Sequence, residues 1–340
     1  MTTRDARATP AGARHEALGL SADALLEMYY YIALARAIDE RMWVLQRAGM
    51  VSFVISGQGH EGAQVGVMAA IDQDRDWLVP FYRSLAACLV KGMSPRDLML
   101  GLFAREGDPS SGGRQMPAHW AHQKHKILST SSPVGTQYLH AVGIAYAAKL
   151  RGTGEVCVTS IGEGGTSQGD WHEAMNFAGI HKLPVLFMVE NNRYAISVPL
   201  RLQMGVPDVA ARAAGYGFPG VVVDGSDVLA CYAAAAGAVR RARAGEGPTL
   251  IECKVERLTA HSSEDRQEKY RPTNDIEASR SKDALVVFKH YLEQVGVMDE
   301  ARYIEIHNRI KAEVNDATDF AEATPWPDPA TVTRNVFFEG

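Results

Sequence analysis

A strand–helix–strand pattern near the middle of the chain limits the possible folds more than any other feature of the sequence. Two β-rich apolar runs, 156–161 and 183–189, flank a segment with helical spacing at 170–179. Strands that are joined through a helix lie parallel, and the loops at their carboxyl ends open on one edge of the sheet, where α/β proteins bind ligands. The pattern therefore predicts an α/β fold with a mostly parallel sheet flanked by helices.

Both of these strands are followed by polar residues that suit a metal-bound phosphate. The first run leads into a Gly-Glu-Gly sequence centred on Glu163, and the second leads into Asn191-Asn192. The Glu163 carboxylate, the Asn192 amide oxygen and the backbone carbonyl of Tyr194 form an all-oxygen set that suits magnesium, which keeps other positions for water and phosphate oxygens. We therefore expect Glu163 and Asn192 to meet and to hold a diphosphate through a metal ion. The alternative is an ordinary βαβ unit with a solvated acidic loop.

The bulk composition argues against several classes of function. The 340 residues carry a formal net charge of −5 and a pI near 6.1, without the basic footprint of a nucleic-acid-binding protein. The four cysteines form no CxxC pair, which argues against a thiolate metal site or a disulfide framework and fits a reducing cytoplasm. No apolar run approaches membrane-spanning length. We expect a cytoplasmic protein that uses neither nucleic acid nor membrane as a partner.

The chain is long enough for one large domain, which we expect between two tails. Residues 1–20, rich in Ala, Arg and Thr, predict a mobile N-terminal tail, and residues 21–320 predict a single domain. Residues 321–340 predict a C-terminal tail. Within the domain, the patterns predict helices at 21–48, 138–150, 228–244 and 281–314, a long functional loop at 101–130, and strands at 50–55, 77–81, 221–223 and 249–255.

A glycine-rich sequence at 57–62 matches the GxGxxG pattern of dinucleotide-binding proteins. That pattern also needs an acidic residue at the end of the next strand to hold the ribose. Asp72, Asp74 and Asp76 all precede the next β-rich run, so they lie at its wrong end. The sequence therefore favours a helix-start loop near the active-site edge. An NAD-dependent dehydrogenase that uses the Gly57 loop is the alternative.

Several separated motifs resemble those of thiamine-diphosphate-dependent 2-oxoacid dehydrogenases, in particular the alpha subunit of their first, decarboxylating component. The family signature is an acidic residue between glycines, followed some two dozen residues later by two asparagines, and the resemblance runs from about Ser21 to the last residues. Glu163 looks like the variant of some branched-chain enzymes, whereas Glu190 resembles the pyruvate-type form. The identity of the 2-oxo acid substrate is therefore left open. The motifs are Tyr82-Arg83, GGRQMPAHW with His119, the loop 131–137, Gly162-Glu163-Gly164 with Asn191-Asn192, and LTAHSSED with His261.

The resemblance implies a thiamine-diphosphate-binding fold with thiamine diphosphate and magnesium as cofactors. Glu163, Asn192 and Tyr194 would hold the magnesium, while Tyr82 and Arg83 would bind the diphosphate. The other residues that the resemblance places at the cofactor are Ser132, Val134, Gly162, Gly164, Gly165 and His261.

The resemblance also gives roles to two histidines and to one loop. His261 and His119 would help the acyl intermediate reach a lipoyl group, and Ser262 matches a position that mitochondrial relatives phosphorylate. A zinc site formed by His119 with His122 and His125 is an alternative, disfavoured because no carboxylate or cysteine accompanies them. In related branched-chain enzymes the matching loop binds potassium, which here implies Ser131, Pro133, Thr136 and Gln137.

The resemblance finally implies a reaction and its partners. The family decarboxylates a 2-oxo acid on thiamine diphosphate and transfers the acyl group to the lipoyl-bearing acyltransferase component of a multienzyme complex. This chain has only one module of this kind, and in the family the activating glutamate comes from a beta subunit. We therefore expect an α2β2 heterotetramer. A pyruvate or acetoin dehydrogenase alpha subunit and a catalytically silent scaffold subunit are the alternatives.

Overall fold

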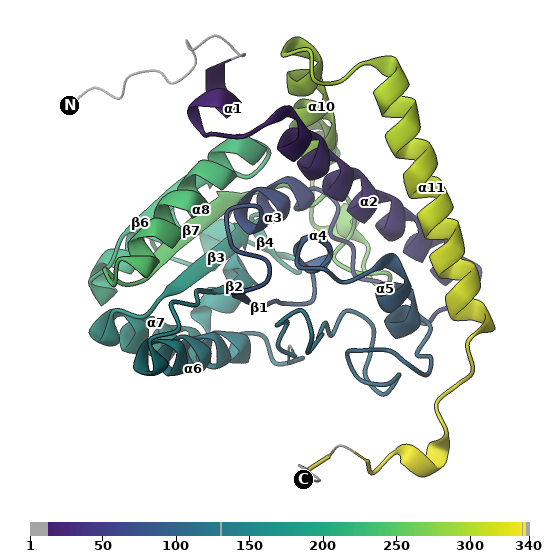
Figure 1. Cartoon of the computed structure of the whole chain (residues 1–340), viewed down its shortest axis with the longest axis horizontal. Coiled ribbons are helices and arrows are strands. Elements are labelled where there is room, and N and C mark those ends of the chain that lie inside the picture. The colour runs from purple at the N-terminus through teal and green to yellow at the C-terminus, as the bar shows by residue number, and fades with distance from the viewer. Residues whose placement is uncertain (1–12, 130, 335, 338–340) are drawn as a thin grey trace.

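The computed structural model describes residues 13–129, 131–334 and 336–337. At its centre lies a five-stranded sheet in the order β1-β2-β3-β7-β6, and every pair of neighbouring strands is parallel (Figure 1). The α/β fold with a mostly parallel sheet is therefore confirmed. The strands are β1 (Trp77–Val79), β2 (Cys157–Gly162), β3 (Val185–Asn191), β6 (Gly220–Asp224) and β7 (Thr249–Lys254), and a separate small hairpin pairs β4 (Tyr194–Ala195) with β5 (Val198–Pro199).

Helices cover both faces of the sheet. The α-helices are α1 (Ala13–Ala17), α2 (Ala22–Arg47), α3 (Glu61–Met68), α4 (Leu85–Val90), α5 (Pro95–Leu102), α6 (Thr136–Arg151), α7 (Gly169–His181), α8 (Val228–Arg243), α9 (Thr273–Ser279), α10 (Ala284–Gln294) and α11 (Glu300–Ala323). Short 3₁₀ segments are η1 (Glu163–Ser167), η2 (Leu200–Leu202), η3 (Val209–Tyr216), η4 (Gln267–Lys269), η5 (Arg280–Lys282) and η6 (Pro329–Thr331).

The alternation of side chains along the strands divides the interior into two apolar cores. In β3, Leu186 and Met188 belong to the core that contains α3 and α8, whereas Val185, Phe187 and Val189 belong to the core formed with α6 and α7. Successive residues of a strand point to opposite faces, so a strand that is apolar at every position must be covered on both sides. Figure 1 shows these two helix layers on either side of the sheet.

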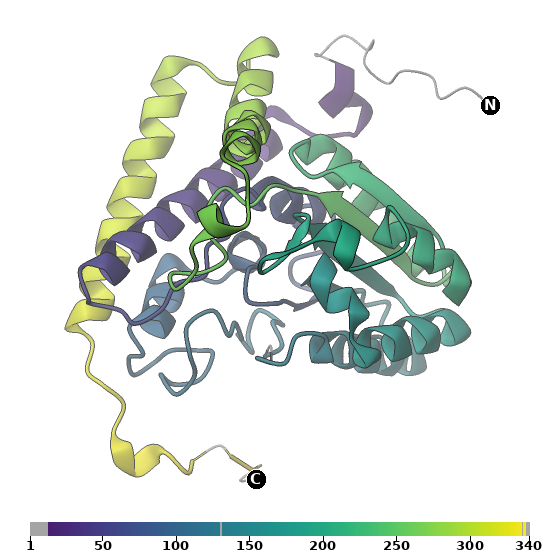
Figure 2. The same cartoon turned by 180° about the vertical axis from the view of Figure 1, so that it is seen from behind.

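The long helix α2 begins where its capping residue predicts. The Ser21 side chain accepts a hydrogen bond from the backbone N–H of Ala24 (3.1 Å), which satisfies one of the free amides of the first turn. Helix α11 runs beside α2, as the view from behind also shows (Figure 2). The expected helix at 21–48 is therefore confirmed. No helix in the described ranges combines the length and the apolarity that crossing a membrane requires.

The prediction of a strand at 50–55 is wrong. This segment has no strand structure, because its backbone bonds to a distant loop instead of a sheet neighbour. Val54 accepts a hydrogen bond from the Ser263 N–H (2.9 Å), and the Val54 N–H donates to the Ser263 hydroxyl (3.2 Å). The apolar run therefore anchors the loop that carries His261.

The tails expected at the two ends are also more ordered than predicted. Helix α1 lies within the expected N-terminal tail, and its His15 is buried with Nδ1 2.8 Å from the Tyr291 hydroxyl. Residues 1–12 lie outside the described ranges. Near the other end, α11 continues to Ala323, and the Pro325 carbonyl accepts a hydrogen bond from Glu106 (3.0 Å). Helices α1 and α11 therefore reach past the boundaries expected at residues 20 and 321. The helices expected at 281–314 are α10 and α11, and α11 continues beyond that range to Ala323.

Candidate functional site

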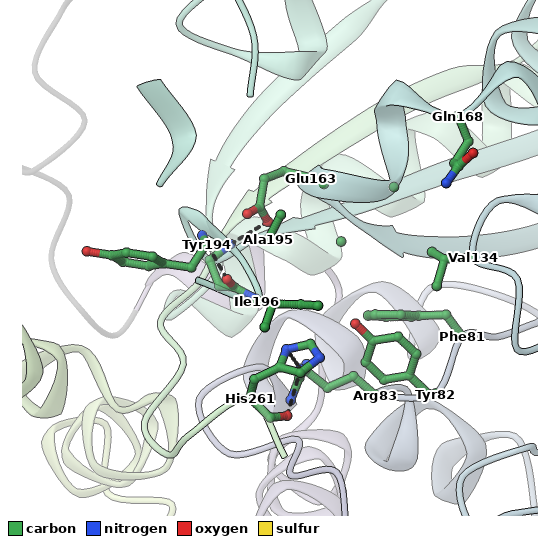
Figure 3. A pocket seen from close by; sticks show the side chains of 14 residues that line it. Phe81, Tyr82, Arg83, Val134, Glu163, Gln168, Tyr194, Ala195, Ile196 and His261 are labelled. Atoms are coloured by element: carbon green, nitrogen blue, oxygen red, sulfur yellow. Dashed lines mark hydrogen bonds between the residues drawn. The ribbon is translucent and has the colours of Figure 1, made fainter. Parts of the chain in front are cut away.

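A cavity of about 280 Å³ opens at the carboxyl edge of the sheet (Figure 3). It lies where the segments after β1, β2, β3 and β7 converge, as the parallel topology requires. Most of the residues expected at the cofactor lie on its wall. These are Tyr82, Arg83, Val134, Gly162, Glu163, Gly164, Gly165, Asn192, Tyr194 and His261.

Hydrogen bonds link the three residues that are expected to hold the metal, Glu163, Asn192 and Tyr194. Strands β2 and β3 pair with Gly162 opposite Glu190, so the loops that follow them are neighbours. The Asn192 N–H donates to Glu163 Oε2 (3.2 Å), and the Tyr194 N–H donates to Asn192 Oδ1 (3.1 Å). Burial raises the pKa of the Glu163 carboxyl, whose residue is 2% exposed. A divalent cation would stabilise that buried carboxylate, so the donor set fits magnesium.

Two of the glycines are required by close packing. A Cβ on Gly164 would lie 2.5 Å from the Ala195 Cβ, and one on Gly165 would lie 2.4 Å from the Ile161 Cδ1. Gly164 and Gly165 also line the cavity, so the backbone of η1 is open to a ligand there, which is how a glycine-rich loop approaches a phosphate.

The turn after Asn192 bends through a non-glycine residue with positive φ. Arg193 has φ 73°, a conformation that is uncommon for residues with a side chain. Its guanidinium forms ion pairs with Glu256 (2.5 Å) and Asp275 (3.1 Å), which come from the segment after β7. These contacts hold the turn in its bent shape.

Tyr82 and Arg83 follow β1 and take different positions at the cavity. The Tyr82 hydroxyl points into the cavity in Figure 3. Arg83 is only 2% exposed, and its guanidinium donates to the Ser56 carbonyl and, over 3.3 Å, to the His261 carbonyl. Arg83 therefore links three loops as well as lining the cavity, which the sequence did not reveal.

The pKa of His261 lies well below the ordinary value for a histidine. Burial, followed by the positive charges of Arg83 and Arg257, lowers the pKa of His261 to about 3. Its Nδ1 lies 3.3 Å from Arg83 Nη2, and arginine can only donate. The imidazole is therefore neutral at neutral pH, with its proton on Nε2.

His119 and Ser132 contact each other but do not line the cavity. His119 Nδ1 lies 3.0 Å from the Met116 carbonyl and Nε2 lies 2.5 Å from the Ser132 hydroxyl. The carbonyl can only accept, so Nδ1 donates to it, and in the neutral ring Nε2 accepts from Ser132. The zinc alternative has no support: within the described ranges, no group of three or more His, Cys, Asp or Glu side chains could hold a metal ion.

The loop expected to bind potassium is tied to the rest of the fold. Gln137 Oε1 accepts from the Gly135 N–H (2.9 Å) and Gln137 Nε2 donates to the Ser160 carbonyl (3.1 Å). The Thr136 hydroxyl donates to Asp170 (3.2 Å) at the start of α7. The loop therefore braces β2 and α7, while the potassium role of Ser131, Pro133, Thr136 and Gln137 stays a prediction.

The glycine-rich sequence at 57–62 cannot hold a nucleotide phosphate in this structure. The Gly57 N–H donates to Asp39 Oδ2 (2.6 Å), and the Gly59 N–H donates to Glu61 Oε2 (2.6 Å). Both amides therefore bind carboxylates of the chain itself, where a dinucleotide site would offer free N–H groups to the pyrophosphate. The geometry contradicts the NAD alternative.

A buried polar cluster behind the cavity was missed at the sequence level. It comprises His60, Gln64 and Glu190, all of them buried. Burial raises the pKa of Glu190 to about 8 and lowers the pKa of His60 well below its usual value. A glutamate inside the apolar strand β3 was the available signal, because a buried charge needs a specific partner.

The fold and the site together define an α/β protein with a cavity at the carboxyl edge of a parallel sheet, where proteins of this class bind ligands. The chain belongs to the dehydrogenase E1 component family, whose model matches residues 29–330. The resemblance to thiamine-diphosphate-dependent 2-oxoacid dehydrogenases is thereby confirmed, as is the expectation of an oxidoreductase. Membership of this family implies thiamine diphosphate as the cofactor.

Curated relatives cover almost the whole chain. A 2-oxoisovalerate dehydrogenase subunit alpha of Bacillus subtilis is 47% identical over 324 residues, which are 95% of this chain and 98% of the relative. A 3-methyl-2-oxobutanoate dehydrogenase subunit alpha of Mycobacterium tuberculosis is 38% identical over 92% of this chain and 84% of its own length. A pyruvate dehydrogenase E1 component subunit alpha of Staphylococcus aureus is 35% identical over 90% of this chain and 80% of its own length.

Proposed function

We propose that this chain is the alpha subunit of a branched-chain 2-oxoacid dehydrogenase. In this role it decarboxylates a 2-oxo acid on thiamine diphosphate and passes the acyl group to a lipoyl domain. The observation that carries the proposal is the contact between Glu163 and Asn192 at the cavity wall, in a chain 47% identical to a 2-oxoisovalerate dehydrogenase alpha subunit. The 35% identity to a pyruvate dehydrogenase alpha subunit keeps pyruvate as the second candidate substrate.

Magnesium would be held by Glu163, Asn192 and the Tyr194 carbonyl, and the diphosphate by Tyr82 and Arg83. The cofactor, when bound, supplies a carbon nucleophile and an electron sink for decarboxylation. The chain's own residues bind and orient it, and the buried Arg83 offers a fixed positive charge without the cost of reorganisation. Val134, Gly162, Gly164 and Gly165 would line the cofactor, and Ser132 would reach it through the loop that Gln137 braces.

His261 would act as a neutral hydrogen-bond donor. Since Nδ1 accepts from Arg83, the proton sits on Nε2, and this N–H can stabilise negative charge that develops on the substrate oxygen. His119, held by Met116 and Ser132 outside the cavity, would act on the approaching lipoyl group.

The proposal includes partners and a location. A beta subunit would complete an α2β2 heterotetramer, since the relatives are themselves alpha subunits. The lipoyl-bearing acyltransferase component would take up the acyl group. We place the protein in the cytoplasm, because its four cysteines are free and buried, as suits a reducing compartment.

The test compares the purified chain with the same chain co-expressed with its beta subunit. Decarboxylation of 3-methyl-2-oxobutanoate and of pyruvate is measured with thiamine diphosphate and magnesium present. We expect turnover only from the pair, with a higher kcat/KM for the branched substrate. Robust turnover by the chain alone would contradict the subunit assignment, and a preference for pyruvate would favour the second candidate. A pair that fails to bind the cofactor would support a silent scaffold subunit.

A further inference from the structure

His60 lies between the expected metal ligand Asn192 and a buried carboxylate. Its ring is fully buried, with Nδ1 2.7 Å from Glu190 Oε2 and Nε2 3.4 Å from Asn192 Nδ2. Neither the cofactor roles nor the substrate chemistry proposed above makes use of His60. The direction of its two hydrogen bonds can be worked out from a backbone group at the Asn192 end of the network.

At the Asn192 end, the Tyr194 N–H fixes the amide. A backbone N–H can only donate, and it lies 3.1 Å from Asn192 Oδ1, so this atom is the oxygen. The Asn192 NH₂ group therefore faces His60, and His60 Nε2 must accept from it. The ring proton is then on Nδ1, which donates to Glu190 Oε2.

At the other end, the Ala87 N–H fixes Gln64 in the same way. It donates to Gln64 Oε1 (3.2 Å), so the Gln64 NH₂ group faces the Arg83 carbonyl (2.9 Å) and Glu190 Oε2 (2.8 Å). Glu190 Oε2 therefore accepts from Gln64, and it can accept from His60 Nδ1 as well. This arrangement is compatible with the direction that the Asn192 end sets, in which His60 Nδ1 donates to Glu190 Oε2.

We propose that His60 is a positioning residue that acts with the Tyr194 N–H to hold the Asn192 amide with its oxygen toward the metal-diphosphate site. A flipped amide would direct its NH₂ group at the Tyr194 N–H and at the cation, and its oxygen at the lone pair of Nε2. Each of these contacts is repulsive, so the histidine and the Tyr194 N–H together select one orientation of the ligand. Partners behind a ligand orient it in this way at many metal sites. The inference rests on the proposed function, because it takes Asn192 as a metal ligand.

The test uses the copurified α/β pair with two substitutions at His60. H60F keeps a buried ring and removes both hydrogen bonds, whereas H60Q can still donate to Glu190 and accept from Asn192. Magnesium affinity is measured by calorimetry at saturating thiamine diphosphate. We expect H60F to weaken magnesium binding about 10–100-fold and H60Q to restore most of it. The KM for the 2-oxo acid at saturating magnesium should change little in either variant.

A matched pair at Glu190 separates the hydrogen bond from packing. E190Q keeps an acceptor oxygen for His60 and Gln64, whereas E190L removes it at similar volume. We expect E190Q to bind magnesium nearly as the unsubstituted pair does and E190L to behave like H60F. Unchanged magnesium affinity in H60F would overturn the proposal. An equal loss in H60F and H60Q would overturn it as well, because it would indicate packing alone.

The tautomer offers a readout that needs no cofactor. Nitrogen-15 spectra of histidine-labelled protein, compared with H60Q, should show the His60 proton on Nδ1, and a proton on Nε2 would overturn the proposal. If the unsubstituted pair fails to bind thiamine diphosphate with magnesium, the proposed function is contradicted. The tautomer then still decides the direction of the hydrogen bonds.

Discussion

The backbone amide of Asn192 donates a hydrogen bond to the Glu163 carboxylate over 3.2 Å, although the two residues lie 29 positions apart in the sequence. The register of β2 and β3, rather than a flexible loop, brings the two residues together in space. A rigid sheet edge that presents both groups is the kind of support a metal site needs, because small displacements of a ligand weaken binding.

Removing the charge of Glu163 should weaken metal binding selectively. E163Q keeps an oxygen that can accept from the Asn192 N–H but lacks the negative charge that magnesium requires. We expect magnesium affinity to fall by about 100-fold, on the scale of changes at metal-site ligands and their partners. Calorimetry on the α/β pair measures this, with the exposed Glu173→Gln as the control. An unchanged magnesium requirement in E163Q would rule out Glu163 as a ligand.

Replacing Arg83 by lysine should weaken the diphosphate contact while keeping the charge. A lysine cannot reproduce the fork that reaches the Ser56 and His261 carbonyls and faces the cavity. We expect R83K to lower thiamine diphosphate affinity about tenfold, which is about 1.4 kcal/mol. Titration of the cofactor at fixed magnesium measures the loss, with Arg201→Lys on the surface as the control. Equal affinity in R83K would place the diphosphate elsewhere.

Stability should fall in acid partly because of His261. The folded pKa of this residue is about 3, below the value of 6.5 for an unperturbed histidine, so between these values the unfolded state binds more protons. Its contribution is fully present above pH 6.5 and is lost as the pH falls toward 3. We expect the unsubstituted chain to lose about 1–2 kcal/mol more than H261N between pH 7 and pH 5. Urea unfolding at both pH values measures this difference, and parallel losses in the two proteins would contradict it.

Asp39 should be important for stability without touching the cofactor. It accepts hydrogen bonds from the Gly57 N–H (2.6 Å), the Ser56 hydroxyl (2.8 Å) and the Gln58 amide (2.9 Å). D39A leaves these donors unpaired, and we expect a loss of about 3 kcal/mol in the free energy of unfolding. Asp74→Ala, at an exposed position, should stay within about 0.5 kcal/mol of the unsubstituted chain. Because the Gly57 loop is not expected to bind a dinucleotide, added NADH should stabilise neither variant.

A carboxylate at position 262 should disturb the loop that carries His261. Ser262 is only 8% exposed, so S262E forces a charged side chain into a crowded position beside the imidazole. We expect acyl transfer to a lipoyl domain to fall by at least about tenfold, while S262A stays close to the unsubstituted protein. The assay compares lipoyl-dependent turnover with decarboxylation measured through an artificial electron acceptor. Full lipoyl-dependent activity in S262E would contradict the role assigned to this loop.

The sequence predicted those parts of the molecule in which local pattern and tertiary structure agree. The apolar runs of β2 and β3 and the Ser21 cap of α2 combine strong local signals with burial, and they appear where expected. The β-rich run at 50–55 has the same kind of signal, but its backbone bonds to Ser263, which no local pattern can reveal. Propensity alone does not identify the partner of a segment.

At the site, residue types were easier to predict than their environments. Glu163 and Asn192 could be paired from topology, because parallel strands bring their carboxyl ends together. The low pKa of His261 could not be predicted, since it depends on burial and on two arginines distant in sequence. His60 looked like part of a glycine-rich loop, and only its three-dimensional neighbours reveal its contact with Asn192.

The positive φ of Arg193 has a consequence for limited proteolysis. Its ion pairs to Glu256 and Asp275 make the bend beside Asn192 depend on a distant, largely surface segment, which includes the exposed Arg266 and Lys269. Trypsin cleavage there would loosen the bend and so abolish cofactor retention without removing any residue of the cavity wall. By mass action, bound cofactor should in turn protect this segment from the protease.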